Sequence, residues 1–140
     1  MGIVADTSVF TLCERRRWTA KQVAQHLNDL FSNEQIVIPS IVAAELVHGI
    51  YRAKTQAQST QRRAYVEPVL SSYLSAAFTE DVAWIAGRVR AEQTAMGNML
   101  PIAGSFIAAT ALALNFSILT HNLKDFTRIP GLQVIPFVLP

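Results

Sequence analysis

The sequence has one cysteine, six glycines and six prolines in 140 residues, and no long apolar run. The single Cys13 excludes an internal disulfide and a cysteine-based metal cluster, and we expect it to be a small buried apolar residue of a protein in the reducing cytoplasm. No apolar stretch approaches the roughly 18 residues of a membrane span. Residues 1–6 lack the basic region and long apolar core of a secretory signal, so we expect no membrane association.

Charged residues are also few, at 16% of the chain, and the formal net charge is only +2. That value is too small to indicate a nucleic-acid partner by itself. The basic residues are nevertheless grouped: one run comprises Arg15, Arg16 and Arg17, and a looser group lies within residues 52–63. The arginine run is a candidate contact for an RNA backbone, and it is equally typical of a solvated helix face.

A hydrophobic content of 51% with few helix breakers predicts one compact domain over residues 1–140. Short apolar stretches at residues 3–5, 36–38, 118–119 and 132–135 predict buried strands, and they alternate with segments of helical periodicity. This alternation predicts an α/β fold with a parallel sheet flanked by helices.

Helices are expected at residues 9–15, 18–31, 40–53 and 80–95, with a turn at 96–98. In the second of these helices, Val23, Leu27, Leu30 and Phe31 should form the apolar face. Thr7 or Ser8, Thr19 and Ser40 are the expected N-caps of the first three. Residues 55–73 begin polar and then regain an apolar helical stripe, which predicts a helical-hairpin arm whose apolar surface is partly an interface.

The segment that organises the chain is a small-residue helix over residues 100–112, followed by a strand and a loop with Thr120, Asn122 and Asp125. Asp6 directly follows the first predicted strand, and Glu45 lies one turn into the helix after the second. Chemistry in open parallel sheets gathers where strands end. The sequence therefore predicts that the Asp6, Glu45 and Asp125 carboxylates meet at one sheet edge.

Clustered carboxylates repel one another unless a cation lies among them, and oxygen ligands suit Mg²⁺ or Mn²⁺. Such an ion lowers the pKa of a bound water and offsets charge during phosphodiester hydrolysis. Spacing alone leaves structural alternatives open: Asp6 as a helix cap, Glu45 as a partner of Arg52, and Asp125 as a loop-capping residue. A dehalogenase-type site is disfavoured, because Ser8 stands where it requires a second aspartate.

Over nearly its whole length the sequence resembles the PIN-domain ribonucleases, specifically the VapC toxins of bacterial type II toxin–antitoxin systems. The segments that carry the resemblance are IVADTS at 3–8, IPS at 38–40 with Glu45 and Leu46, IAATAL at 107–112, LTHN at 119–122 with Asp125 and Phe126, and IPGL at 129–132. It implies a PIN-like three-layer fold, usually dimeric, and Mg²⁺- or Mn²⁺-dependent cleavage of RNA, often tRNA or ribosomal RNA. The implied partner is a VapB antitoxin whose C-terminal tail covers the active site.

The resemblance also implies roles for individual residues. Asp6 would be the principal metal ligand, and Glu45 and Asp125 would bind through water or orient the nucleophile. Hydrogen bonds to these carboxylates would come from Thr7, Thr120 and Asn122.

One position departs from the family pattern. Three residues before Ile107, the family has a metal-binding aspartate, and this chain has Gly104. Loss of a charged ligand predicts a weakened or inactive nuclease whose fold and antitoxin surface survive. Either the aspartate was replaced by design or by selection against toxicity, or the chain is a naturally degenerate member. The alternative function is a catalytically dead PIN-fold module that binds antitoxin–operator complexes or RNA.

Overall fold

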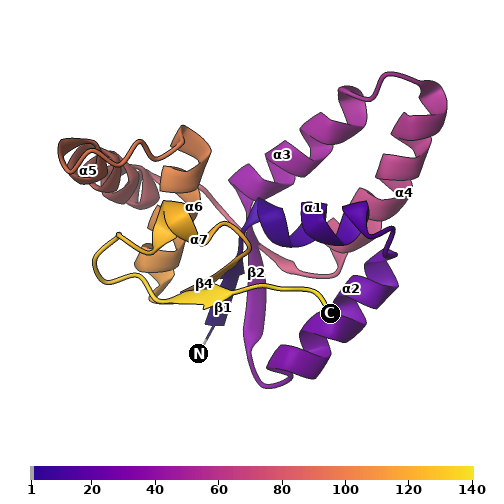
Figure 1. The fold of residues 1–140 in the computed structure, drawn as a ribbon, viewed down its shortest axis with the longest axis horizontal. Coiled ribbons are helices and arrows are strands. Elements are labelled where there is room, and N and C mark those ends of the chain that lie inside the picture. The colour runs from indigo at the N-terminus through magenta and orange to yellow at the C-terminus, as the bar shows by residue number, and fades with distance from the viewer. Residues whose placement is uncertain (1) are drawn as a thin grey trace.

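A computed structural model describes residues 2–140, and within them one sheet of five parallel strands forms the centre of the molecule (Figure 1). The strand order is β3-β2-β1-β4-β5. The strands are β1 (Gly2–Ala5), β2 (Gln35–Pro39), β3 (Leu74–Ala76), β4 (Ser117–Thr120) and β5 (Val134–Pro136). The predicted α/β class and parallel sheet are therefore confirmed.

The central strand β1 is buried because its residues are apolar on both faces, as in a sheet covered by helices on each side. Every residue of β1 is buried, and Val4 pairs with Val37 of β2 and Ile118 of β4. From β1 the chain first builds the sheet outward through β2 and β3, then crosses to β4 and β5 on the other side. The ends of β1 and β4 therefore form the topological switch point, where open α/β sheets bind ligands.

Seven helices within residues 2–140 surround this sheet. They are α1 (Thr7–Arg15), α2 (Ala20–Phe31), α3 (Ser40–Tyr51), α4 (Gln56–Ser71), α5 (Glu80–Ala95), α6 (Ile102–Leu114) and α7 (Leu123–Phe126). Figure 1 shows α3 and α4 as a hairpin that extends from the sheet, with α5 and α6 at the opposite side of the molecule. The predicted helical-hairpin arm is confirmed. No helix among these residues is long and apolar enough to span a membrane.

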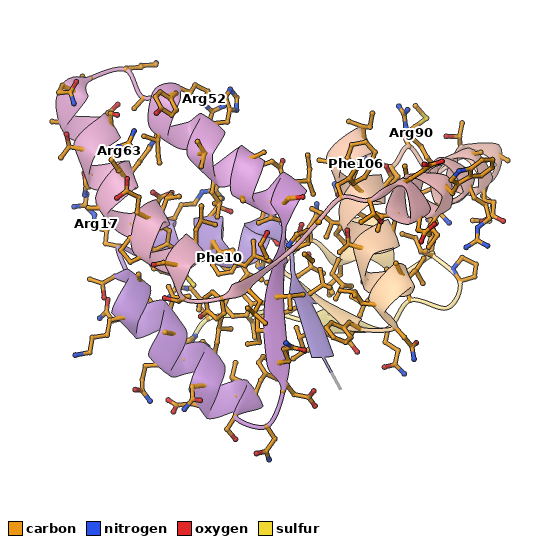
Figure 2. The ribbon with its side chains drawn as sticks, turned by 180° about the vertical axis from the view of Figure 1, so that it is seen from behind. Phe10, Arg17, Arg52, Arg63, Arg90 and Phe106 are labelled. Atoms are coloured by element: carbon orange, nitrogen blue, oxygen red, sulfur yellow. The ribbon has the colours of Figure 1, made fainter. Side chains whose placement is uncertain are left out.

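The arm is fastened to the body of the domain. The buried Tyr65 hydroxyl of α4 donates a hydrogen bond of 2.6 Å to the Phe10 carbonyl of α1. Within the arm, Arg62 of α4 donates one of 2.7 Å to the Gly49 carbonyl of α3 and so joins its two helices. Phe10 itself lies between the arm and the sheet (Figure 2). Tyr65, with Val66, belongs to the main core, so this part of the arm's apolar stripe is internal packing. That another part of the arm is an interface stays a prediction.

Two of the expected caps are wrong. Asp6, not Thr7 or Ser8, is the N-cap of α1, and it makes no side-chain cap bond. Pro39 precedes α3, and the Ser40 hydroxyl instead accepts a hydrogen bond from the Phe78 N–H. Thr19 is confirmed as the cap of α2, where it forms a capping box with Gln22.

Other expectations were wrong at the edges of elements. Leu30 is 52% exposed rather than part of the apolar face of α2, and α3 ends at Tyr51 rather than Ala53. The edge strand β3 was missed, because its three residues carry no alternating pattern and become a strand only through pairing with β2. Cys13 is buried as expected, and this burial raises the pKa of its thiol to about 11.

Candidate active site

Asp6 is held at the switch point by two hydroxyl groups. It follows β1, and its N–H donates a 3.0 Å hydrogen bond to the Leu119 carbonyl of the neighbouring β4. Its Oδ2 atom accepts hydrogen bonds from Ser8 (2.6 Å) and from Thr120 at the end of β4 (2.8 Å). The carboxylate is buried, with 6% of the residue exposed. This arrangement fixes one oxygen, while Oδ1 accepts no hydrogen bond from within residues 2–140.

Ser8 has a part in the site that sequence reasoning missed. Besides its bond to Asp6, its Oγ lies 3.2 Å from Thr120 Oγ1 and accepts a 2.9 Å bond from the His121 N–H. Ser8 thereby ties the start of α1 to the loop after β4. In the sequence, the only sign of this role is that Ser8 stands two residues after Asp6, which ends the first strand. Its contacts with Thr120 and His121 become evident only in the folded structure.

Glu45 lies beside the same strand end through Thr7. The Thr7 hydroxyl, next to Asp6 in the chain, donates a short hydrogen bond to Glu45 Oε1. Glu45 is exposed, and no ion pair joins it to Arg52 in the part of the chain that the structure describes. The alternative of a Glu45–Arg52 pair is therefore wrong, and the hydrogen bond predicted from Thr7 is present.

Asp125 faces its own loop. Asn122 donates from Nδ2 to Asp125 Oδ2 at 2.5 Å, while the Asn122 N–H donates to Thr120 Oγ1 at 2.9 Å. Among residues 2–140, no three His, Cys, Asp or Glu side chains converge into a group that could hold a metal ion. The expected meeting of three carboxylates is thus incomplete: Asp6 and Glu45 are neighbours through Thr7, and Asp125 closes the loop after β4.

Gly104 is the third residue of α6 and is buried, in a helix that packs against β1, β4 and α3. A Cβ built there would lie 3.1 Å from Leu100 Cδ1, and its next contacts would be at 3.7 and 3.8 Å. Because Leu100 Cδ1 is the end of a flexible side chain, a shift of a few tenths of an ångström admits a side chain. The adjacent Ser105 hydroxyl donates back to the Ile102 carbonyl at 2.6 Å and so is committed to its own helix.

The donor chemistry fits a hard divalent ion only in part. The Asp6 and Glu45 carboxylates supply the oxygen ligands that Mg²⁺ and Mn²⁺ prefer. A glycine at position 104 supplies neither charge nor a side-chain oxygen. The residues present therefore fall one carboxylate short of the set that the sequence led us to expect.

The arginine run does not act as one surface. Arg15, Arg16 and Arg17 are all exposed, and Arg16 also donates a 2.8 Å hydrogen bond to the Pro140 carbonyl of the C-terminal segment. Arg15 and Arg17 differ from it in their surroundings. These two line a cavity of about 500 Å³ between the α1–α2 junction and α4, together with Trp18 and Arg62. Glu14 also lines it, and burial raises the pKa of that carboxyl, against the opposing effect of Arg62 and Arg15.

Comparison with known proteins places this fold and strand-end site in a family. The PIN domain model matches residues 3–132, so the chain belongs to the PIN-domain family. Within that family it is similar to proteins named VapC. It is 31% identical over 135 residues to Ribonuclease VapC of Rickettsia bellii, which covers 96% of both chains. It is 27% identical over 119 residues to the tRNA(fMet)-specific endonuclease VapC of Salmonella typhimurium, covering 84% of this chain and 88% of the other.

Solved structures agree with this assignment. The chain superimposes on VapBC2 from Rickettsia felis, solved with a DNA fragment from their promoter, with a TM-score of 0.85 and 26% identity over 99% of this chain and 100% of the other. VapBC-1 from nontypeable Haemophilus influenzae gives a TM-score of 0.78 at 26% identity, over 97% and 98% of the two chains. The PIN-like fold expected from the sequence is confirmed.

Proposed function

We propose that this chain is the toxin component of a VapBC pair: an endoribonuclease that requires Mg²⁺ or Mn²⁺ and is weakened by Gly104. The observation that carries the proposal is the buried Asp6 carboxylate, which is oriented by Ser8 and Thr120 at the switch point of the sheet. A structural helix cap would bond to the backbone of α1, and Asp6 makes no such side-chain bond. Its second oxygen thus remains available to a ligand.

The residues that would hold the ion are Asp6 directly and Glu45 and Asp125 directly or through water. When bound, a divalent ion activates water and offsets negative charge on the phosphodiester. The protein's own part is to fix these carboxylates. Thr120 and Ser8 orient Asp6, Thr7 orients Glu45, and Asn122 orients Asp125.

Gly104 decides how much activity remains. An aspartate there would add the missing charge and oxygen atoms, and the only close contact of its Cβ would be the flexible end of Leu100. The third position of a helix also favours a carboxylate, because the helix dipole is positive at its N-terminus. The Cβ atom of the family residue therefore fits at little steric cost.

The deciding experiment compares RNA cleavage by the chain and by Gly104→Asp, in Mg²⁺ or Mn²⁺ and with an EDTA control. Gly104→Asn is the matched control, since it has the same shape without the charge. We expect metal-dependent cleavage by the aspartate variant and at least 100-fold less by the glycine and asparagine forms, because removal of a comparable electrostatic group costs about 10²–10³ in rate. Cleavage by the glycine form at the rate of the aspartate variant would disprove an essential ligand at this position.

The second candidate is a catalytically dead PIN-fold module for antitoxin–operator complexes or RNA. Two observations favour it: the glycine at position 104, and the absence among residues 2–140 of three converging metal-binding side chains. The similar VapBC2 of Rickettsia felis was solved with promoter DNA. Calorimetric titration with Mn²⁺ separates the two, because a binding module should give no saturable heat and a weakened enzyme should give a weak site lost in Asp6→Asn.

The partners we propose are a VapB-type antitoxin, a tRNA or ribosomal RNA substrate, and a second copy of this chain. Similarity to solved VapBC complexes supports the antitoxin. For RNA we propose contacts at Arg15 and Arg17, beside the cavity at the arm. Figure 2 shows Arg17, Arg52 and Arg63 on the arm side of the molecule, away from Arg90. Arg16 is the third candidate of the run, and its guanidinium also donates a hydrogen bond to the Pro140 carbonyl.

A further inference from the structure

The tip of the helical arm carries a cationic hollow outside the strand-end site. This arm-tip hollow has a volume of about 370 Å³ and is lined by Arg52, Ala53, Lys54, Gln58 and Arg62. In the part of the chain that the structure describes, no carboxylate forms an ion pair with Arg52 or Lys54. Positive charge gathered in a recess in this way attracts anions.

Hydrogen bonds fix the shape of the hollow. The Arg62 guanidinium donates from Nη1 to the Gly49 carbonyl at 2.7 Å, which holds it against the end of α3. The Gln58 side chain accepts a 3.2 Å hydrogen bond from the Lys54 N–H and so closes the turn between α3 and α4. One oriented guanidinium beside two cations without carboxylate partners suits a phosphate group, which accepts several charge-assisted hydrogen bonds at once.

The hollow continues into the larger cavity beside the α1–α2 junction. Gln58 and Arg62 line both spaces, and Arg15 and Arg17 line the cavity. The acidic residue of this region is Glu14, which interacts with Arg62 and Arg15 and lines the cavity but not the hollow. A band of positive charge therefore joins the arginines proposed above as RNA contacts to the tip of the arm.

Helix α3 connects the arm tip with the strand-end site. Glu45, His48 and Arg52 are all exposed, and their spacing of three and four residues places them on one face of the helix. Glu45 accepts the hydrogen bond from Thr7 at the strand end, whereas Arg52 caps the far end of α3. The seven residues between them correspond to about 10 Å along the helix axis. Figure 1 shows α3 leading from the sheet to the tip of the arm.

Tyr51 adds an aromatic surface next to this charge. It precedes Arg52 in the chain and is 74% exposed. Arg63 holds the ring in place, since its Cζ lies 5.5 Å from the ring centroid and its Nη2 donates to the Tyr51 hydroxyl at 3.2 Å. The Arg63 charge itself is paired with Glu67 at 2.9 Å. An exposed and oriented ring beside a phosphate site is a stacking platform for an unpaired base.

We propose that the arm tip is a second RNA-binding site, remote from the scissile bond, in which the hollow holds a backbone phosphate and Tyr51 stacks an unpaired base of the same strand. The strand reaches this site along the exposed face of α3 that begins at Glu45. The inference rests on the RNA substrate proposed above and specifies the part of the chain that selects unpaired RNA. Because the arm tip lies outside the metal site, it binds RNA whether or not Gly104 permits cleavage.

Fluorescence anisotropy of the full chain with a labelled oligouridine dodecamer, in EDTA, tests binding without cleavage. We expect the dissociation constant to rise at least about 5-fold in Tyr51→Ala, the lower end for loss of one stacked base, and to recover in Tyr51→Phe, which keeps the ring. Arg52→Ala and Lys54→Ala should each reduce the salt dependence of log Kd by about 0.7, the value for one phosphate of a single strand. Arg90→Ala is the matched control, because Arg90 is exposed on the opposite side of the molecule (Figure 2).

Double-stranded dodecamers of RNA and of DNA test the selectivity. Both should bind more weakly than the single strand and should not respond to Tyr51→Ala, because their bases are paired and unavailable for stacking. Tighter binding of the DNA duplex that depends on Arg52 would overturn the proposal and assign the arm tip to operator DNA. Loss of antitoxin binding in Tyr51→Ala with unchanged RNA binding would assign it to the antitoxin.

Cleavage kinetics in the Gly104→Asp background provide a second readout. Adding Tyr51→Ala should raise KM and leave kcat unchanged, as expected for a contact remote from the scissile bond. A fall in kcat alone would contradict a remote binding site. If the unaltered chain binds the oligouridine and the Tyr51 and Arg52 variants bind it equally well, the arm-tip site is overturned and the RNA substrate stands. If the unaltered chain binds no RNA, both are overturned.

Discussion

The substitution Gly104→Asp separates metal binding from catalysis if its effect on stability is measured with and without Mg²⁺. Three contributions act in the absence of metal. A residue with a Cβ gains up to about 1 kcal/mol over glycine inside a helix. The contact of 3.1 Å with Leu100 Cδ1 reduces that gain, because the leucine side chain must shift. A buried carboxylate at this position adds a penalty of roughly 1–3 kcal/mol from desolvation and, in the proposed site, from repulsion by Asp6; the helix dipole offsets only part of it.

We therefore expect Gly104→Asp to melt below the glycine form in EDTA, and Gly104→Ala to melt slightly above it. Mg²⁺ should reverse the order. At a concentration 100 times its dissociation constant, an ion that binds only the folded state adds about 2.7 kcal/mol. For a domain of this size, that stabilisation raises the melting temperature by roughly 8 °C.

Differential scanning fluorimetry over a Mg²⁺ series is the assay, with Gly104→Asn as the uncharged control. The reasoning requires a Mg²⁺-dependent rise for the aspartate variant that is at least several degrees larger than for the glycine and asparagine forms. Equal rises for all three would show that position 104 takes no part in metal binding. No rise for any of them would remove the proposed site itself.

Three further outcomes follow from side chains outside the site. Tyr65→Phe should destabilise the fold by about 1–2 kcal/mol in urea titrations, because it leaves the Phe10 carbonyl without its buried donor. Tyr73→Phe should instead be neutral or stabilising, because the buried Tyr73 hydroxyl has no hydrogen-bond partner within residues 2–140. Gln93→Leu should cost about 1–3 kcal/mol by the same assay, as Gln93 bonds the carbonyl of residue 128 and the side-chain amide of residue 98. Burial raises the pKa of Cys13 to about 11, so as pH rises the unfolded chain releases the thiol proton before the folded one does. The free energy of unfolding should therefore fall as pH rises above the ordinary thiol pKa toward 11. In Cys13→Ala this part of the alkaline loss should disappear, and an unchanged pH profile would contradict the reasoning.

The sequence by itself determined those elements whose local signals agree. Residues 80–95 have a capping Thr79, helical periodicity and a terminating glycine at 97, and they form a helix with the predicted bounds. The β-branched stretch before Pro39 became β2, and the apolar run before Asp6 became β1. The order of strands and helices sufficed to bring Asp6 and Thr120 to one edge, because parallel strands end on the same side.

Tertiary structure alone decided the contacts made between distant segments. Strand β3 exists through its pairing with β2, and no pattern in its three residues announces it. Arg16 stays exposed and hydrogen-bonds the Pro140 carbonyl, because the C-terminal segment passes the end of α1. The Asp125 carboxylate accepts its hydrogen bond from the side chain of Asn122, which immediately precedes α7, so its partner is local. Local propensity fixes which segments form helices and strands, whereas the direction of a polar side chain depends on partners that only folding brings within hydrogen-bond reach.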